Sequence, residues 1–278
     1  MRLRSALVNE LGIFASNLGD LSRARAAFAH SQLLDAGATD EESESVDSQN
    51  LAGVELLAGR FLQATEHAER ALALAAWAGD QRTMLFAAFY RTASRLALGD
   101  VSAAVDDFQR ATELERKPLY GLRGIWEAEC KLLRGDRTGA LRQTRGNREI
   151  CVQYDKNADL CRCNALLARL LIPDDPAQAA KHLQDARAFA DRSGVVEFQL
   201  RCLHAACELQ RHLGDHPQSI AEGEAGILLA DTCGFGKCSI DLRLALAETY
   251  LAAGDARQAL QNARNALDRS ELPDCQYA

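Results

Sequence analysis

Residues 244–260 read LALAETYLAAGDARQAL, and this stretch contains the unit from which the chain is built. An apolar segment leads into the turn Ala253-Gly254-Asp255, and a second segment with a small residue at Ala259 follows. The turn recurs at Leu18-Gly19-Asp20, Ala58-Gly59-Arg60, Leu98-Gly99-Asp100, Arg134-Gly135-Asp136 and Leu213-Gly214-Asp215, with Pro173-Asp174-Asp175-Pro176 in the remaining place. The steps are 40, 40, 36, 39, 40 and 40 residues. Such a period predicts a helical repeat array in which each unit packs only against its neighbours.

Small residues recur at one position after each turn and allow two helices to approach closely. Five residues after the turn the chain has Ala24, Ala64, Ala104, Ala140, Ala179, Ser219 and Ala259. Seven to eight residues before the turn, a large or medium apolar residue stands beside a small one, at Leu11-Gly12, Leu51-Ala52, Ala206-Cys207 and Leu246-Ala247. These offsets fit the 3.6-residue period. The repeating unit is therefore predicted to be helix, tight turn and antiparallel helix.

This pattern resembles the tetratricopeptide repeat family over almost the whole chain. The Gly-Asp turn, the small residues, and the Ala and aromatic positions of the second helix, such as Phe28 and Phe108, all match. The family's unit is typically about 34 residues, so the helices or loops here are expected to be longer. Units of this length resemble the C-terminal sensor arrays of bacterial signalling (STAND-type) ATPases and ATP-dependent transcription activators. They also resemble the peptide-binding arrays of Gram-positive quorum-sensing regulators.

The resemblance implies an all-α fold, a right-handed α-solenoid of about seven helix-turn-helix repeats. We expect one superhelical domain over residues 1–278, with repeats at about 2–36, 44–78, 81–116, 118–154, 157–192, 195–232 and 236–270. The opening helix has the pattern of an interior repeat, with Leu3, Leu7, Leu11, Phe14 and Leu18, and Leu272–Ala278 resembles a loop and the start of another helix. Because a free-standing array needs polar end caps, we expect a fragment of a longer array.

Composition and charge argue against a nucleic-acid-binding protein and against a membrane protein. The net charge of −7 and the pI near 5.5 argue against a nucleic-acid partner. No apolar run approaches the roughly 20 residues that cross a bilayer, so no membrane partner is expected. Met1-Arg2-Leu3-Arg4 leads into an amphipathic helix rather than a cleavable signal. We expect a cytoplasmic protein, and the oligomeric state is left open.

The nine cysteines lack the paired spacing of a zinc site or a secreted disulfide scaffold. Cys161 and Cys163 are two residues apart on a helix and point in different directions. We expect the cysteines to be small buried residues in a reducing compartment and to bind no metal.

Motifs that carry catalytic chemistry are missing from the sequence. Cys233-Gly234-Phe235-Gly236-Lys237-Cys238-Ser239 imitates a phosphate-binding loop, but no strand precedes it and Cys follows the lysine. The sequence has no zinc-protease helix and no nucleophile elbow. We therefore predict no enzyme activity and no cofactor.

Two charged segments interrupt the rhythm of the repeats. Asp35–Asp47 holds six acids and no base, which predicts a solvated loop with acids at the N-terminus of the next helix. Residues 110–149 hold ten basic and six acidic residues, and Arg142, Arg145 and Arg148 lie on one helix. A solvated outer face is preferred for this second segment, with a basic ridge for an acidic partner as the alternative.

The resemblance also predicts a binding surface. In tetratricopeptide arrays the first helices line the concave face, and the positions 13, 10 and 6 residues before Gly214 are Arg201, His204 and Glu208. Arg211 extends this helical stripe by one turn. Neighbouring repeats add Cys161 and Leu244 at flanking positions. The expected ligand- or partner-binding residues are Asn164, Arg201, His204, Glu208, Arg211, Asp241 and Glu248.

Polar groups of both signs in a groove suit a protein or peptide partner, or a small acidic ligand, because guanidinium groups hold carboxylates well. The alternative is that these residues are merely solvated. In the third and fourth repeats the same offsets select Phe86, Phe89, Ala93, Leu122, Ile125 and Glu129. Most of these residues are apolar, which predicts an apolar part of the inner face unless they are core. The expected function is the sensor or interaction domain of a larger bacterial signalling protein. A free-standing adaptor that binds a partner peptide in its concave groove is the alternative.

Overall fold

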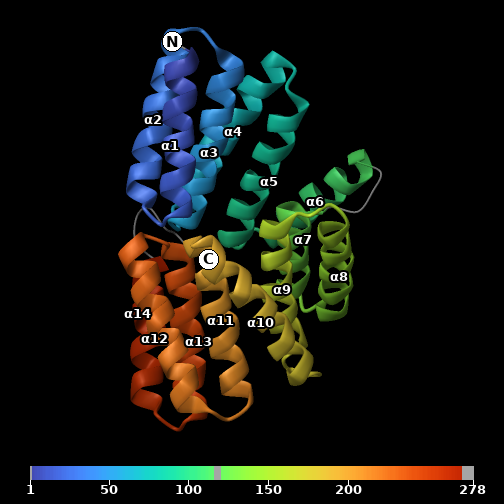
Figure 1. The fold of residues 1–278 in the computed structure, drawn as a ribbon, viewed down its shortest axis with the longest axis vertical. Helices are drawn as coiled ribbons and strands as arrows, with labels where there is room; N and C mark the ends of the chain where they lie inside the picture. Colours follow the sequence, from blue (N-terminus) through green and yellow to red (C-terminus); the bar gives the residue numbers. More distant parts are fainter. Residues whose placement is uncertain (1, 116–119, 271–278) are drawn as a thin grey trace. The chain divides into compact units, whose positions relative to one another are not determined.

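The computed structural model describes residues 2–115 and 120–270, and these residues form fourteen α-helices and no β-strand (Figure 1). The helices are α1 (Arg2–Asn17), α2 (Leu21–Gly37), α3 (Glu41–Leu57), α4 (Phe61–Ala78), α5 (Gln81–Ala97), α6 (Val101–Glu115), α7 (Leu122–Leu133), α8 (Arg137–Gln153), α9 (Asn157–Leu171), α10 (Pro176–Ser193), α11 (Val196–His212), α12 (His216–Cys233), α13 (Gly236–Ala252) and α14 (Ala256–Ser270). The predicted all-α repeat fold is confirmed. The predicted further helix start at Leu272–Ala278 lies outside the described residues.

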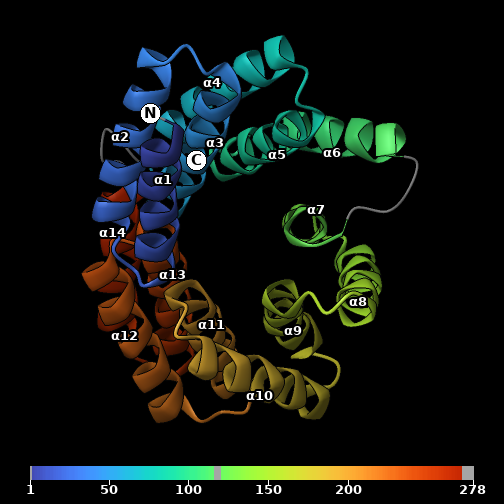
Figure 2. The same cartoon turned by 45° about the horizontal axis from the view of Figure 1, so that its top comes forward.

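The chain divides into two compact units. The described part of unit 1 comprises residues 2–107, 233–237 and Ser270, and unit 2 comprises residues 108–232 and 238–269 apart from 116–119. Within each unit, consecutive helices pack as antiparallel hairpins, as α3 and α4 do in unit 1 and α9 and α10 do in unit 2 (Figure 2). First helices of successive hairpins also touch, α3 with α5 and α9 with α11. Packing between sequence neighbours is the arrangement that the repeat period predicts, whereas one superhelical domain over 1–278 stays a prediction.

Each turn combines a helix stop with a helix start. Gly214, between α11 and α12, has φ +80°, a left-handed conformation that glycine adopts without strain. Asp215 then caps α12, because its Oδ1 accepts a hydrogen bond of 3.1 Å from the backbone N–H of Gln218. The same cap to the third following residue is made by Asp20, Asp100, Asp136, Asp175 and Asp255. The recurring Gly-Asp pair thus reverses the chain without leaving helix ends unsatisfied.

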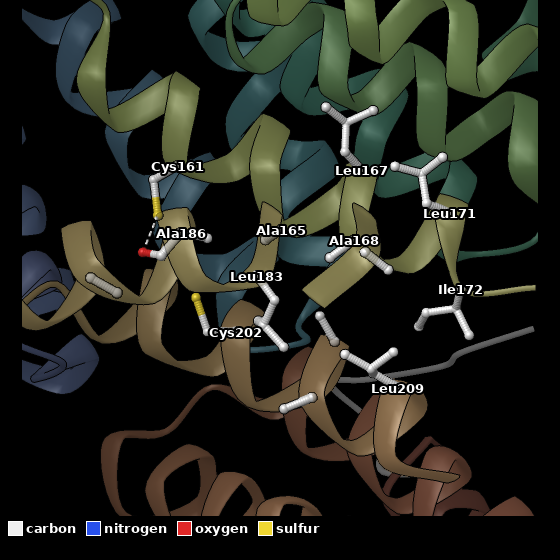
Figure 3. Close-up of a cluster of buried hydrophobic side chains, with 14 of the residues drawn as sticks. Cys161, Ala165, Leu167, Ala168, Leu171, Ile172, Leu183, Ala186, Cys202 and Leu209 are labelled. Carbon is white, nitrogen blue, oxygen red and sulfur yellow. Dashed lines mark hydrogen bonds between the residues drawn. The ribbon is translucent and has the colours of Figure 1, made fainter. Parts of the chain in front are cut away.

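The small residues after the turns lie at the helix contacts, as predicted. Ala24, Ala64, Ala104, Ala140, Ala179, Ser219 and Ala259 are all buried. In unit 2 the core between α9, α10 and α11 includes Leu167, Leu171, Leu183 and Leu209 around several alanines (Figure 3). These alanines let the helices approach closely enough for the leucines to interdigitate.

The short repeat step of 36 residues has a local cause. α7 has only 12 residues, whereas the other first helices have 15 to 17. The side chains that were predicted to line an apolar part of the inner face belong mostly to the core: Phe89, Ala93 and Ile125 are buried. That part of the apolar prediction is wrong, and the core alternative holds for these three residues.

The acidic segment Asp35–Asp47 is not a solvated loop, which corrects the prediction. α2 continues to Gly37 and α3 begins at Glu41, so that residues 38–40 alone connect them. Asp35 and Asp47 are 2% and 1% exposed. The acids of the first turn of α3 do stand where the helix dipole favours them, as predicted.

Six of the eight described cysteines are buried, as predicted, and two are only half-buried. Cys130, Cys151, Cys161, Cys163, Cys202 and Cys207 are buried free thiols, and Cys233 and Cys238 are half-buried free thiols. Across residues 2–115 and 120–270, no group of three or more His, Cys, Asp or Glu side chains has the geometry to hold a metal ion. No described helix is long and apolar enough to cross a membrane.

Candidate binding surface

The predicted stripe on α11 is present in unit 2. Arg201, His204, Glu208 and Arg211 all lie on this helix, and their side chains are 23%, 15%, 19% and 24% exposed. Other faces of α11 are anchored in the core by residues such as Leu209. The stripe is therefore held in place by a packed helix while its polar atoms stay partly accessible.

Glu197, one turn before Arg201, joins two helices at one end of the stripe. Its carboxylate accepts two hydrogen bonds from Arg162 of α9, Nη2 to Oε2 at 2.6 Å and Nε to Oε1 at 3.1 Å. Arg201 Nε donates to the same carboxylate at 2.9 Å, and its Nη1 donates to Glu129 of α7 at 3.0 Å. Burial raises the pKa of Glu197, but the charges of Arg162 and Arg201 outweigh it and lower that pKa to about 2. The carboxylate is thus ionised and clamped.

Glu208 has the corresponding role at the other end of the stripe. Arg169 of α9 grips it with two parallel bonds, Nε to Oε2 at 2.7 Å and Nη2 to Oε1 at 2.9 Å. His204 Nε2 lies 3.3 Å from Glu208 Oε1. Burial raises the pKa of Glu208, but Arg169 and then His204 outweigh it, so that the pKa is well below its usual range. Burial lowers the pKa of Arg169, but the charge of Glu208 outweighs burial, so the pKa of Arg169 is raised.

Arg211 connects the charged residues of α11 to helix α13. Its Nη1 donates to the backbone carbonyl of Ala245 at 3.2 Å and forms an ion pair with Glu248. Asp241, also on α13, helps to raise the pKa of Arg169 through its charge. The structure therefore brings together six of the seven predicted residues, on α11 and α13.

Asn164 is the seventh predicted residue, and it points elsewhere. It is 4% exposed, and its Oδ1 accepts from Arg148 Nε of α8 at 2.9 Å and lies 3.1 Å from His182 Nδ1 of α10. Both partners come from second helices, whereas Arg162 and Arg169 on the same helix α9 face α11. Of the basic segment, Arg142 and Arg145 are exposed on α8, as predicted for an outer face.

We define the charged band as this set of side chains on the first helices α7, α9, α11 and α13: Glu129, Arg162, Arg169, Glu197, Arg201, His204, Glu208, Arg211, Asp241 and Glu248. It contains four guanidinium groups and five carboxylates. Each of its arginines is in an ion pair. The arginines of the band therefore do not bind an incoming anion without competition, because each of them is already paired with a carboxylate of the protein.

The expected binding residues did not include Glu129, Arg162, Arg169 and Glu197, although the offsets in the fourth repeat select Glu129. A signal for three of them was present. Glu197 continues the stripe by one turn before Arg201, and Arg169 stands 39 residues, one repeat, before its partner Glu208. Glu129 stands 6 residues before the turn Gly135, the same offset as that of Glu208 before Gly214, so the offset rule does select it.

No protein-family model matches the sequence, and no curated protein matches it. Among solved structures, a Rap protein complexed with competence and sporulation factor matches with a TM-score of 0.81 at 13% identity, covering 97% of this chain and 75% of that one. The apo form of RapI matches with a TM-score of 0.65 at 11% identity, covering 96% and 97%. A STAND protein with a tetratricopeptide repeat sensor, PH0952 from Pyrococcus horikoshii, matches with a TM-score of 0.51 at 14% identity, covering 74% of this chain and 34% of that one. At these identities the likeness concerns the fold, and the fold of this chain is that of a tetratricopeptide-like α-solenoid.

Proposed function

We propose that the charged band of unit 2 binds a peptide or an extended segment of a partner protein. The observation that carries this proposal is the row of partly exposed, mutually bonded charged groups across the first helices of four successive hairpins. Because these side chains already hold one another in place, a ligand that meets them loses little additional side-chain entropy. The Rap structure of similar fold is complexed with competence and sporulation factor, which supports a ligand-binding role.

The pairing of the charges determines which ligands fit. The bonds to Glu197 and Glu129 use two of the five N–H donors of Arg201, so further donors remain for a ligand carbonyl or carboxylate. Glu248, whose side chain is 66% exposed, offers a carboxylate to a ligand cation. A peptide with charges of both signs satisfies both requirements, whereas a simple anion satisfies one.

The test uses a charge swap that keeps composition and net charge constant. Peptides are selected on the wild-type protein from a phage-displayed random library, and their affinities are measured by fluorescence anisotropy. Arg211→Glu with Glu248→Arg preserves an ion pair but reverses its direction, and we expect binding to fall at least about tenfold, since each 1.4 kcal/mol is a factor of ten. The matched control is Arg142→Glu with Glu149→Arg, on the exposed face of α8.

Equal affinity of the swapped protein and the control would overturn the assignment. The alternative of a small acidic ligand is tested with citrate: a rise in the melting temperature of the wild type, absent in the swapped protein, would favour it over a peptide.

We infer in addition that the chain acts as the ligand-sensing array of a larger bacterial signalling protein in the cytoplasm. The fold that it shares with the sensor-containing STAND protein supports this reading. A free-standing adaptor is the alternative. An immunoblot of the source extract with an antibody against this chain separates the two: a band far above 30.3 kDa supports the larger protein, and a band at that mass supports the adaptor.

A further inference from the structure

Helix α1 exposes leucines that helix α13 buries at the equivalent positions. Twelve and eight residues before their turn glycines, α1 has Leu7 and Leu11, and α13 has Leu242 and Leu246. Leu7 and Leu11 are 63% and 44% exposed, whereas Leu242 and Leu246 are 0% and 1% exposed. Phe14, three residues after Leu11, is 63% exposed. We call Leu7, Leu11 and Phe14 the α1 face.

The leucines of α13 are covered by the helix that precedes it, α12. Ile220 and Ile227 of α12 pack against a core that includes Leu246 of α13. Gly226 of α12 lies so close to Leu242 that a Cβ atom on this glycine would be 2.8 Å from Leu242 Cδ1. A second helix therefore buries the first helix of the next hairpin with two large apolar side chains and a small residue between them.

Helix α14 exposes the same two large positions. Six and 13 residues after its turn glycine, α14 has Leu260 and Leu267, at the positions of Ile220 and Ile227 in α12. They are 51% and 55% exposed, and the small residue Ala263 lies between them. We call Leu260, Ala263 and Leu267 the α14 face. The chain thus carries both halves of the contact that joins α12 to α13, one on α14 and the other on α1.

The charges on the two faces are complementary. Glu10 lies three residues after Leu7, on the side of α1 that carries the α1 face. Arg264 lies four residues after Leu260, on the side of α14 that carries the α14 face. Both side chains are exposed. Contact between the α1 face and the α14 face brings a carboxylate to a guanidinium group, whereas contact between two copies of the same face brings like charges together.

We propose that the α14 face of one copy of this chain binds the α1 face of a second copy, head to tail. The occupant is a second copy because the chain itself presents the counterpart of each face, with equivalent apolar positions and opposite charge. The stack of repeats then continues from one chain into the next, as α12 continues into α13. Because two different surfaces meet, every added copy offers a new open face, and the assembly does not stop at a symmetric dimer.

The small size of the two faces predicts a weak association. Only two or three large apolar side chains come from each face, so the contact belongs among the small, transient interfaces, and we expect a dissociation constant of roughly 100 µM. At lower concentrations the chains are single and both faces are exposed to water. Neither face includes a residue of the charged band, so this inference does not rest on the proposed function.

Sedimentation equilibrium of the full chain, at about 5–500 µM, measures the association. We expect the weight-average mass of the wild type to rise with concentration from the 30.3 kDa of one chain. Leu7→Lys with Phe14→Lys alters the α1 face, and Leu260→Lys with Leu267→Lys alters the α14 face. Each variant is expected to stay at the mass of one chain, because burying a lysine charge in the contact is costly. Leu228→Lys, at a 70% exposed position of α12, is the matched control and should associate like the wild type.

A mixture of the two face variants tests the direction of the contact. The variant altered on the α1 face keeps its α14 face, and the other keeps its α1 face. An equimolar mixture is therefore expected to form a complex of two chains and nothing larger. Glu10→Arg or Arg264→Glu alone should weaken the association of the wild type by about tenfold, because like charges then meet. Both changes in one chain should restore it.

Circular dichroism of each variant shows whether its helices are intact. A wild type that keeps the mass of one chain at the highest concentration would overturn the proposal and assign the two faces to a partner other than a second copy. Association that survives in either face variant would also overturn it, because another surface would then be responsible. A mixture of the two face variants that stays at the mass of one chain would rule out the head-to-tail contact.

Discussion

At the scale of single residues, Glu197 holds two guanidinium groups of the charged band. Arg162 and Arg201 both bind its carboxylate, and together they lower its pKa to about 2 against the effect of burial. A carboxyl whose pKa is depressed on folding stabilises the folded state above its unfolded pKa of about 4.3. That stability is lost as the pH falls through the folded pKa. The decrease in the free energy of unfolding of unit 2 at acid pH therefore reports on Glu197.

We expect unit 2 to lose stability between about pH 5 and pH 2, with Glu197 contributing about 3 kcal/mol. Glu197→Gln is expected to lower the free energy of unfolding near neutral pH by up to about 3 kcal/mol, because Arg162 and Arg201 each lose one of their two carboxylate partners. The difference from the wild type should shrink on acidification. Urea unfolding followed by Trp126 fluorescence, in a Trp77→Phe background, measures it; a difference that stays constant down to about pH 3 would contradict the assignment.

Asp47 in unit 1 is a carboxyl with the opposite behaviour. Burial, with a smaller contribution from Asp35, raises its pKa to about 7 against the effect of hydrogen bonds from Asn9 and Ser31. Its Oδ2 is buried without a hydrogen-bond partner. Between the unfolded and folded pKa values the folded state binds more protons, so the stability of unit 1 falls as the pH rises through that window.

We expect the wild type to lose stability in unit 1 between about pH 4 and pH 7, by up to about 1.4 kcal/mol per pH unit. Asp47→Asn should remove this loss, since the amide does not ionise, while Asp106→Asn on the exposed side of α6 should not. Pulse proteolysis in urea, read on peptides from residues 2–97, measures the effect. A slope in Asp47→Asn equal to that of the wild type would rule the mechanism out.

The burial of Asp47 was predictable from the repeat register, although composition suggested a loop. It stands 12 residues before the turn Gly59, and the same position in other repeats holds Ala87, Cys202 and Leu242, all buried. Sequence reasoning weighed the local charge run above the long-range period. The repeat spacing of 39 residues relates Arg169 to Glu208, but the offset rule does not pair them, because it names positions on a helix and not which neighbour each side chain contacts.

At the scale of the helix, α1 carries the large apolar side chains that its sequence pattern shows, and they are exposed. Leu3, Leu7 and Phe14 are 76%, 63% and 63% exposed, and Leu18, directly after the helix, is 72% exposed. At 100° per residue, these positions and Leu11 fall within an arc of about 80°. One repeat later, Leu51 occupies the place of Leu11 and is buried. The same sequence pattern therefore has different energetic consequences in the two helices.

We expect Leu7→Lys with Phe14→Lys to leave the melting temperature of the chain within about 2 °C of the wild type, because exposed apolar groups contribute little to folding. Leu51→Ala should cost about 2–5 kcal/mol, because it leaves a cavity. Differential scanning calorimetry compares the two variants, and dye binding to exposed apolar surface should fall only in the lysine variant. A large loss of stability in that variant would show that the face of α1 is covered in solution.

The helices themselves were the most predictable feature, because the Gly-Asp turn is a local signal. Gly254 has φ +84°, and Asp255 caps α14 at 3.0 Å, so the turn needs no distant contact to form. The shorter length of α7 could not be predicted from the turn that follows it, although Glu129, at the same offset from Gly135 as Glu208 from Gly214, does join the charged band. Element order followed from the sequence, whereas the inner-face positions Phe89, Ala93 and Ile125 are buried in the core.

At the scale of the whole molecule, the charged band lies entirely within unit 2. Its ion pairs join α7 to α11, α9 to α11, and α11 to α13. In a repeat protein each hairpin is stabilised chiefly by its neighbours, so ligand binding at the band is expected to protect adjacent hairpins most strongly. The distribution of this protection along the chain therefore tests the location of the site.

We expect a peptide selected on the wild-type protein to slow amide hydrogen exchange in α9, α11 and α13, and to leave α1 to α5 unchanged. At a free concentration 100 times the Kd the stabilisation is about 2.7 kcal/mol, or roughly a hundredfold slower exchange for amides that open with the unit. Arg211→Glu with Glu248→Arg should abolish this protection at the same peptide concentration, and the α8 control should keep it. Protection confined to α1 to α5 would place the ligand in unit 1. Protection of both units to the same degree would mean that the band is at most part of the binding surface, because hairpins several repeats away from a bound ligand gain stability only through the contacts between them.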